Sequence, residues 1–228
     1  MSNSSIWVVI PAYNEAKVLG DVLGELRKYD PSYNIVVVDD GSSDGTADAA
    51  NRIGVHVVVH PVNLGQGAAL ATGIEYALQK GAGVVVTFDA DGQMRPEDIG
   101  LLVNQVADSG IDVALGSRFL TSPPEGMPLT KKMGLRLATM LTRLTTGLNI
   151  TDTHNGIRAF KAEALRKIAI TQNRMAHASE ILSEIARNKL RYKEVPVTIR
   201  YTKYSKAKGQ SLLNSINILF ELFTGGRK

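Results

Sequence analysis

The stretch VVVTFDADGQ, residues 84–93, is an apolar run that ends in two acids. A continuous run of β-branched and aromatic residues predicts a strand that is buried on both faces. Asp89 and Asp91 lie two positions apart, so both carboxylates of an extended segment point to the same side, and we expect a positive group between them. With Gln93 they form an all-oxygen cluster that suits Mg²⁺ or Mn²⁺. The alternative is a solvated turn, because Asp and Gly favour turns by themselves.

Similar apolar runs recur on both sides of this stretch and alternate with helical patterns. We expect strands at 6–12, 34–42, 55–61 and 112–119, and helices at 14–29, 43–54, 64–82 and 95–110. This alternation predicts an α/β fold, with a mostly parallel sheet that carries helices on both faces. Such sheets bind ligands beyond the carboxyl ends of their strands, which here read PAYNE, DDGSSDGT, HPVNLGQG, DADGQ and GSRF. No GxGxxG follows the first strand and no GxxxxGK[ST] occurs, which argues against a dinucleotide fold and a P-loop.

The pattern changes after residue 120. Residues 129–148 predict an amphipathic helix, and its apolar side carries Met133, Leu137, Met140, Leu141, Leu144 and Leu148. Residues 150–161 are polar and indicate a loop, residues 176–189 predict a helix, and residues 192–201, with their proline, predict an edge strand. We expect residues 1–209 to form the main domain and residues 210–228 to form an amphipathic C-terminal helix.

The composition excludes some classes of protein. The 228 residues include no cysteine, so disulfides and thiolate metal sites are excluded, as suits a reducing compartment. No apolar stretch approaches the roughly 20 residues that span a bilayer, and the apolar run near the N-terminus is too short for a secretory signal. The net charge of +4 would suit nucleic acid, anionic lipid or a phosphorylated substrate. Aromatic platforms do not alternate with the basic residues, so we expect no nucleic-acid partner.

Four motifs accompany the first four predicted strands in order: PAYNE, VVVDDGSSDGT, NLGQGAAL and FDADGQ. With these motifs the chain resembles the family 2 glycosyltransferases. More narrowly, it resembles the branch that contains dolichol-phosphate mannose synthase and bacterial polyprenyl-phosphate sugar transferases. The resemblance is strong over residues 6–120 and continues through GSRF, DTHNGIRAF, EIL and EVPVTIRY to about residue 200. It implies a GT-A fold and an inverting transfer of sugar from a nucleotide sugar.

The resemblance also assigns a nucleotide site to the strand ends. Asp39 would accept a hydrogen bond from the imide N–H of uracil. Gly65 and Gly67 would let the backbone approach the nucleoside. The full set implied is Pro11, Ala12, Tyr13, Glu15, Asp39, Asp40, Gly65, Gly67, Asp89, Ala90 and Asp91.

The metal and the leaving group follow from the same resemblance. Asp89, Asp91 and Gln93 would hold Mg²⁺ or Mn²⁺ on the donor diphosphate. Arg118, together with the metal, would stabilise negative charge on the departing nucleoside diphosphate. The alternative for Arg118 is an ordinary ion pair with an acid at a strand end.

Two kinds of acceptor remain open at this point. A lipid phosphate is already an anionic nucleophile, so it needs cations to place it rather than a base. The candidate cations are Lys131, Lys132, Arg136, Arg200, Lys206 and Lys208, among which the resemblance favours Arg136 and Arg200. A sugar hydroxyl requires a base. Asp152 matches a position often suspected of that role in the family, and His154 is the alternative base.

We therefore expect a metal-dependent enzyme that moves a sugar from a nucleotide sugar to a polyprenyl phosphate, with UDP favoured over GDP-mannose. The expected location is the cytoplasmic face of a membrane. Direct transfer to a polysaccharide is the alternative enzyme activity, and a nucleic-acid-binding module is the alternative outside the enzyme class. Many members of the family carry transmembrane helices after this domain. Residues 210–228 are expected to dock on the membrane surface or on a small multi-span membrane protein; the alternative is that they pack on the domain itself or on a second copy in a homodimer.

Overall fold

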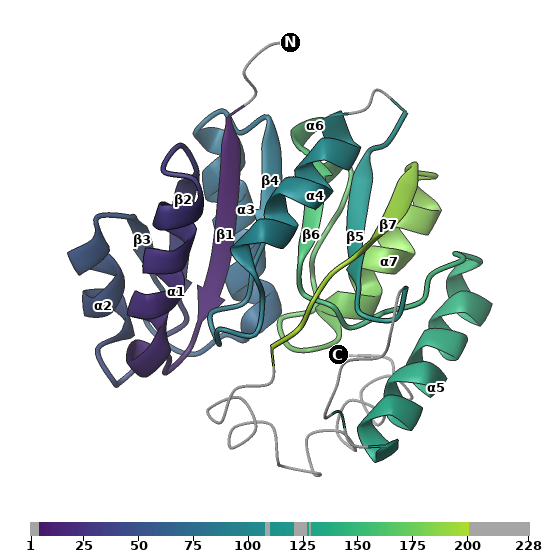
Figure 1. The fold of residues 1–228 in the computed structure, drawn as a ribbon, viewed down its shortest axis with the longest axis horizontal. Coiled ribbons are helices and arrows are strands. Elements are labelled where there is room, and N and C mark those ends of the chain that lie inside the picture. The colour runs from purple at the N-terminus through teal and green to yellow at the C-terminus, as the bar shows by residue number, and fades with distance from the viewer. Residues whose placement is uncertain (1–4, 108–109, 121–126, 128, 201–228) are drawn as a thin grey trace.

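The computed structural model of the chain describes residues 5–107, 110–120, 127 and 129–200 (Figure 1). Within these ranges one seven-stranded sheet has the order β3-β2-β1-β4-β6-β5-β7. The strands are β1 (Ile6–Ala12), β2 (Asn34–Asp39), β3 (His56–Val59), β4 (Val84–Thr87), β5 (Val113–Ser117), β6 (Arg158–Lys161) and β7 (Tyr192–Pro196). The helices are α1 (Ala16–Tyr29), α2 (Thr46–Ile53), α3 (Gln66–Gln79), α4 (Pro96–Ala107), α5 (Leu129–Thr146), α6 (Ala162–Leu165) and α7 (His177–Arg187).

The mostly parallel sheet that the sequence predicts is confirmed. β1 pairs in parallel with β2 and β4, β2 pairs in parallel with β3, and β5 pairs in parallel with β7. The predicted elements before residue 120 correspond to β1–β5 and α1–α4. β7 lies at the edge of the sheet, as its proline indicates, and Pro196 is its last residue.

The expectation that residues 150–161 form a loop is wrong for the last four of them. Arg158–Lys161 form β6, which lies inside the sheet and runs antiparallel to both β4 and β5. Ala159 and Phe160 are fully buried. The strand has only four residues, with a cation at each end, so it lacks the apolar run that marks its neighbours. Its place in the sheet comes from pairing on both sides and from burial.

Two apolar cores cover the two faces of the sheet, because successive side chains of a strand point to opposite faces. Val8 and Ile10 of β1 join the core beneath α1 and α4, whereas Trp7 and Val9 join the core beneath α3 and α7. The helices therefore enclose the sheet from both sides (Figure 1). This enclosure leaves the ends of the strands as the place where polar loops meet.

α5 stands apart from this arrangement (Figure 1) and packs against α7. It confirms the amphipathic helix predicted at 129–148, but its small and hydroxyl residues face the protein: Ala138, Thr139 and Thr142 are buried. The exposed stripe of α5 consists of Leu129, Met133, Leu137, Met140 and Leu144.

No helix in the ranges given above combines the length and the apolar composition needed to cross a bilayer. The helix expected at 210–228 lies outside the described residues, as do Lys206 and Lys208 and the side chain of Lys131.

Candidate active site

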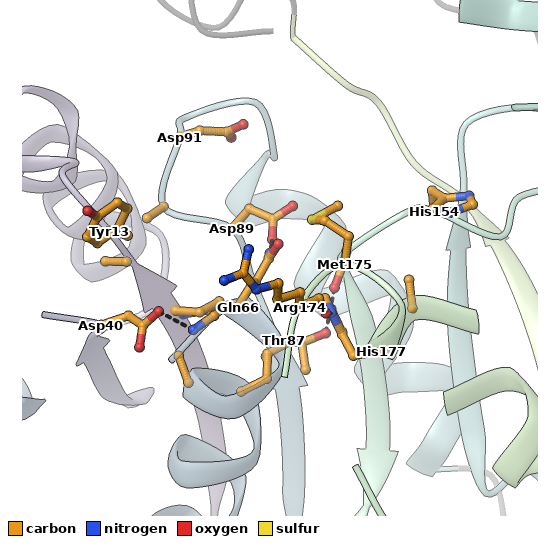
Figure 2. A pocket seen from close by; sticks show the side chains of 18 of the residues that line it. Tyr13, Asp40, Gln66, Thr87, Asp89, Asp91, His154, Arg174, Met175 and His177 are labelled. Carbon is orange, nitrogen blue, oxygen red and sulfur yellow. Dashed lines mark hydrogen bonds between the residues drawn. The ribbon is translucent and has the colours of Figure 1, made fainter. Parts of the chain in front are cut away.

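A cavity of about 700 Å³ lies at the carboxyl ends of β1, β2 and β4 (Figure 2). One wall comes from the predicted strand ends. Ten of the expected residues line it: Pro11, Ala12, Tyr13, Glu15, Asp40, Gly65, Asp89, Ala90, Asp91 and Gln93. The opposite wall comes from two later segments of the chain, residues 154–158 and 174–181. The structure thus brings together residues that lie more than 150 positions apart.

Asp89 lies directly after β4, deep in this cavity. Its Oδ1 accepts a hydrogen bond from Gln66 Nε2 at 3.2 Å. Its carboxylate also packs on the backbone of Gly156, where an added Cβ would overlap the carboxylate oxygens. Burial, and then the nearby Asp91 charge, raise the pKa of Asp89 to about 7, although Arg118 and Arg158 act in the opposite direction. The partly buried Asp89 carboxylate is therefore short of compensating positive charge.

Asp91 and Gln93 shape the loop that follows. Asp91 Oδ1 accepts the backbone N–H of Gln93 at 3.0 Å, and Asp91 Oδ2 accepts Gln93 Nε2 at 2.6 Å. Gly92 between them has a φ of +73°, a conformation that favours glycine. Both side chains remain on the cavity wall with Asp89.

These groups fit a divalent ion. Oxygen donors of this kind suit Mg²⁺ or Mn²⁺, and the undercompensated charge at Asp89 would be relieved by a cation. In the described part of the chain, no three acidic, His or Cys side chains form a group that could hold a metal ion. An ion held by Asp89 and Asp91 would therefore take its remaining ligands from a bound molecule, with Gln93 beside it.

The two acids after β2 have different surroundings. Asp39, expected to meet uracil, accepts the backbone N–H groups of Ser42 at 2.9 Å and of Ala47 at 3.1 Å, and it is not among the cavity-lining residues. Asp40 does line the cavity, and its Oδ2 accepts the N–H of Gly65 at 2.7 Å. Of these two carboxylates, Asp40 is therefore the one that faces the cavity.

Gly65 and Gly67 are needed for a reason that the sequence did not indicate. An added Cβ on Gly65 would overlap the carbonyl of Asn173, and one on Gly67 would overlap the carbonyl of Gln172. The N–H of Gly67 also donates to the Asn173 carbonyl at 2.8 Å. The close approach at these glycines is thus made by another loop of the same chain, residues 172–177, hereafter the α7 loop. Gly65 lines the cavity, whereas Gly67 lies beneath that loop.

Arg118 and Asp152 form a buried ion pair. The sequence left open an ion pair for Arg118 with an acid at a strand end, whereas Asp152 lies in the loop between α5 and β6. Arg118 Nε lies 2.6 Å from Asp152 Oδ2, and its Nη2 donates to the carbonyl of His154 at 2.8 Å. Neither side chain of the pair is among the cavity-lining residues. The pair braces the loop between α5 and β6 beside the cavity.

That loop places His154 and Arg158 on the cavity wall. His154 Nδ1 is buried without a hydrogen-bond partner in the described structure, and burial lowers the pKa of His154 to about 4. Arg158 donates to the carbonyls of Asn155, Thr153 and Ala178, and burial lowers its pKa to about 10. Arg158 therefore ties the loop before β6 to the start of α7.

Of the expected acceptor cations, Lys132, Arg136 and Arg200 have side chains that the structure describes, and none of the three lines this cavity. Arg200 Nη1 pairs with Glu25 Oε2 at 2.9 Å, and its backbone N–H donates to the Gln93 carbonyl at 2.8 Å. Its side chain and that of Asp91 line a smaller hollow of about 200 Å³. Arg136 is exposed on α5.

The α7 loop was missed as a site element. Arg174, Met175 and His177 line the cavity, and the Arg174 and Met175 side chains point into it (Figure 2). The loop has no motif of its own. Its only signal is indirect: the glycines at 65 and 67 leave room for it.

Residues 7–169 match the family model described as Glycosyl transferase family 2. The chain is 35% identical over 243 residues to the UDP-N-acetylglucosamine--dolichyl-phosphate N-acetylglucosaminyltransferase of Methanococcus voltae, with 97% of this chain and 96% of that protein covered. It is 32% identical over 232 residues to the polyprenol monophosphomannose synthase of Mycolicibacterium smegmatis, with 96% and 87% covered.

Among solved structures, a glucosyl-3-phosphoglycerate synthase from Mycobacterium tuberculosis, in complex with Mg²⁺ and uridine-diphosphate, has a similar fold. The TM-score is 0.72 at 18% sequence identity, with 100% of this chain and 82% of that chain covered. The GT-A type of fold implied by the motifs is confirmed.

Proposed function

Because the chain belongs to glycosyl transferase family 2 and is a glycosyltransferase, we propose that it moves a sugar from a nucleotide sugar, UDP-linked in preference to GDP-linked, to a polyprenyl phosphate. The relative from Methanococcus voltae is named for a UDP-sugar donor and a dolichyl-phosphate acceptor, and it aligns with almost the whole chain. The relative from Mycolicibacterium smegmatis is likewise named for a polyprenol product.

The observation that carries the proposal is the pair Asp89 and Asp91 on the wall of a cavity of about 700 Å³, a size suited to a small-molecule ligand. A divalent ion held there would neutralise the donor diphosphate and stabilise the charge that develops as the sugar departs. Gly156 allows the Asp89 carboxylate to sit against the backbone, and Gln66 orients it. The nucleoside would lie toward Tyr13 and Asp40, at the other end of the same wall.

A polyprenyl phosphate needs no general base, because its phosphate oxygen is already anionic. The ion pair between Arg118 and Asp152 supports this acceptor, since it engages the carboxylate that a hydroxyl acceptor would need as base. Arg200 can instead receive the phosphate beside Asp91. It would exchange its ion pair with Glu25, and a half-exposed pair of this kind contributes only about 0–1 kcal/mol. Arg136 on α5 is the second proposed phosphate contact.

The lipid tail of such an acceptor stays in the bilayer, so the enzyme has to approach the membrane. The exposed stripe of α5 supports a peripheral contact, because large apolar side chains on one face of a helix favour the membrane interface. We place this contact on the cytoplasmic face. Residues 210–228 would extend it directly, or through a multi-span membrane protein or a second copy of the chain.

The proposal is tested by transfer of radiolabelled sugar from UDP-sugars and GDP-mannose to a polyprenyl phosphate in detergent micelles, with MnCl₂ or EDTA. We expect organic-extractable label from a UDP-sugar with MnCl₂ and none with EDTA. Asp91→Asn should abolish the transfer, whereas Asp48→Asn, an exposed acid on α2, should keep it. Label that enters only a water-soluble polysaccharide would refute the lipid acceptor, and full activity in EDTA would refute the metal.

A further inference from the structure

Arg174 of the α7 loop is a cation that the site as described so far does not use. Its side chain is exposed, lines the cavity and points into it (Figure 2). Among the residues that the structure describes, its guanidinium has no hydrogen-bond or ion-pair partner. By contrast, Arg118 is paired with Asp152, and Arg158 donates to three backbone carbonyls. Of the two arginines on the cavity wall, Arg158 and Arg174, only Arg174 therefore has a guanidinium without a partner in the described part of the chain.

The backbone that carries Arg174 is held in place on several sides. The Asn173 carbonyl accepts the N–H groups of Gly67 and Ala68, at 2.8 and 3.2 Å. His177 Nδ1 donates to the Arg174 carbonyl at 2.7 Å. A fixed backbone limits the positions that the side chain can reach, so the guanidinium is presented to the cavity from a rigid base.

Glu180 fixes the beginning of this loop from within α7. Its carboxylate accepts the backbone N–H groups of Thr171 at 3.0 Å and of Gln172 at 2.9 Å. Three separate contacts, to α3, to His177 and to Glu180, thus position a loop that has no regular secondary structure. Such support is expected for a loop that holds a ligand group rather than one that only connects two elements.

The position of Arg174 along the cavity indicates which part of a donor it meets. Its stem lies on Gly65 at the start of α3, where a built Cβ would be 3.1 Å from Arg174 Cγ. Figure 2 shows its guanidinium directed toward the part of the cavity that Gln66 and Asp89 occupy. Arg174 therefore lies between the expected nucleoside end and the metal-binding acids. In a nucleoside diphosphate sugar, the group between those two places is the diphosphate.

The charge of the cavity favours the same assignment. Four acids line it, Glu15, Asp40, Asp89 and Asp91, and the two arginines on its wall are Arg158 and Arg174. A diphosphate entering so acidic a site needs positive charge besides a single divalent ion. A guanidinium suits it, because its planar set of donors can bind two phosphate oxygens at once.

We propose that Arg174 is the diphosphate-binding arginine of this enzyme and contacts the nucleoside diphosphate both in the bound donor and as it departs. This inference rests on the proposed function, and it gives Arg174 the role that the sequence suggested for Arg118. In the reaction, the acceptor phosphate oxygen forms a bond to the anomeric carbon while the bond to the diphosphate oxygen breaks. The electron pair of that bond stays on the nucleoside diphosphate, where Arg174 stabilises it.

The test is isothermal titration of UDP and of uridine into wild-type protein, Arg174→Gln and Arg174→Lys, all with MnCl₂. Arg174→Gln should weaken UDP binding by roughly ten- to a hundredfold, as expected for loss of a hydrogen bond between charged groups. Uridine, which has no phosphate, should bind equally to all. Arg174→Lys should recover part of the UDP affinity, because it restores the charge without the planar fork. Arg166→Gln, an exposed arginine that does not line the cavity, is the matched control.

Several outcomes would overturn the assignment. Unchanged UDP affinity in Arg174→Gln would refute it, and so would an equal loss for UDP and uridine, which would place Arg174 at the nucleoside end. A lysine variant as weak as the glutamine variant would show that charge is not the cause. Wild-type protein that does not bind UDP would refute the proposed function with a UDP-linked donor as well. Wild-type binding with an unaffected Arg174→Gln would refute only the role of Arg174.

Discussion

Replacing Asp89 by Asn would remove a carboxylate whose ionisation destabilises the metal-free fold. Burial and the neighbouring Asp91 raise the pKa of Asp89 from 3.8 to about 7. The native protein therefore holds a proton at this site over a range of pH in which the unfolded chain has released it. The contribution of Asp89 to the free energy of unfolding is largest below pH 3.8. It falls as the pH rises toward 7 and no longer changes above 7.

The size of the effect follows from the same two pKa values. The difference between 3.8 and about 7 corresponds to about 4 kcal/mol once the pH lies above both values. About 2 kcal/mol of this is lost between pH 5.5 and pH 8.5. Asp89→Asn does not titrate, so its stability relative to wild type should rise by about 2 kcal/mol over that interval. For a chain of this length, the relative Tm should rise by about 4–8 °C.

Thermal unfolding in EDTA, followed by circular dichroism at both pH values, would measure this difference. Asp48→Asn is the control, because it makes the same chemical change at an exposed position of α2. At pH 8.5, MnCl₂ with UDP should stabilise wild type by mass action, by about 2.7 kcal/mol at a hundred times the dissociation constant. Asp89→Asn should gain little from the same additions.

Parallel stability curves for wild type and Asp89→Asn between pH 5.5 and pH 8.5 would refute this reasoning. They would mean that the Asp89 carboxylate is already compensated by the protein. An equal response of both proteins to MnCl₂ and UDP would separately refute the role of Asp89 in holding the ion.

Three further changes test the surroundings of the site. Gly67→Ala would put a Cβ into the α7 loop and should lower the free energy of unfolding in urea by about 1–3 kcal/mol, whereas Gly20→Ala, with open space around it, should not. Arg118→Gln would leave Asp152 buried without its cation and should cost about 3–5 kcal/mol by the same assay; unchanged stability would contradict a bracing role. His154→Gln should leave the shape of the pH–activity profile above pH 5 unchanged, because the pKa of His154 is about 4 and the ring is neutral there.

The strands and helices before residue 120 could be predicted from the sequence for a physical reason. Each parallel strand is buried on both faces and so appears as a continuous apolar run, and its polar end marks the site. Asp89, Asp91 and Tyr13 were found in this way, and all three line the cavity. Asp39 and Asp40 were both predicted for the nucleotide site, and only Asp40 lines the cavity, since the sequence pattern alone does not tell which of two adjacent acids faces it.

The second half of the site could not be predicted, because it is made by contacts distant in sequence. β6 is four residues long and gains its place from pairing on both sides. Arg174 reaches the cavity only because its loop packs on Gly65 and Gly67 of a much earlier segment. Arg118 was expected to face the ligand, but in the structure its side chain pairs with Asp152. No local sequence pattern distinguishes an arginine that faces a ligand from one that forms an internal ion pair.

The antiparallel position of β6 has a consequence for the order in which the protein can be assembled on the ribosome. β5 pairs with β6 and β7 and with no earlier strand of the described sheet, so it cannot join the sheet until the ribosome has released residues 158–161. Until then β4 is an open edge of apolar residues, the kind of surface that invites pairing with another chain. A nascent chain that has emerged only as far as α5 therefore carries Asp89 and Asp91 beside an unpaired sheet edge. The later segments that complete the cavity also cover that edge.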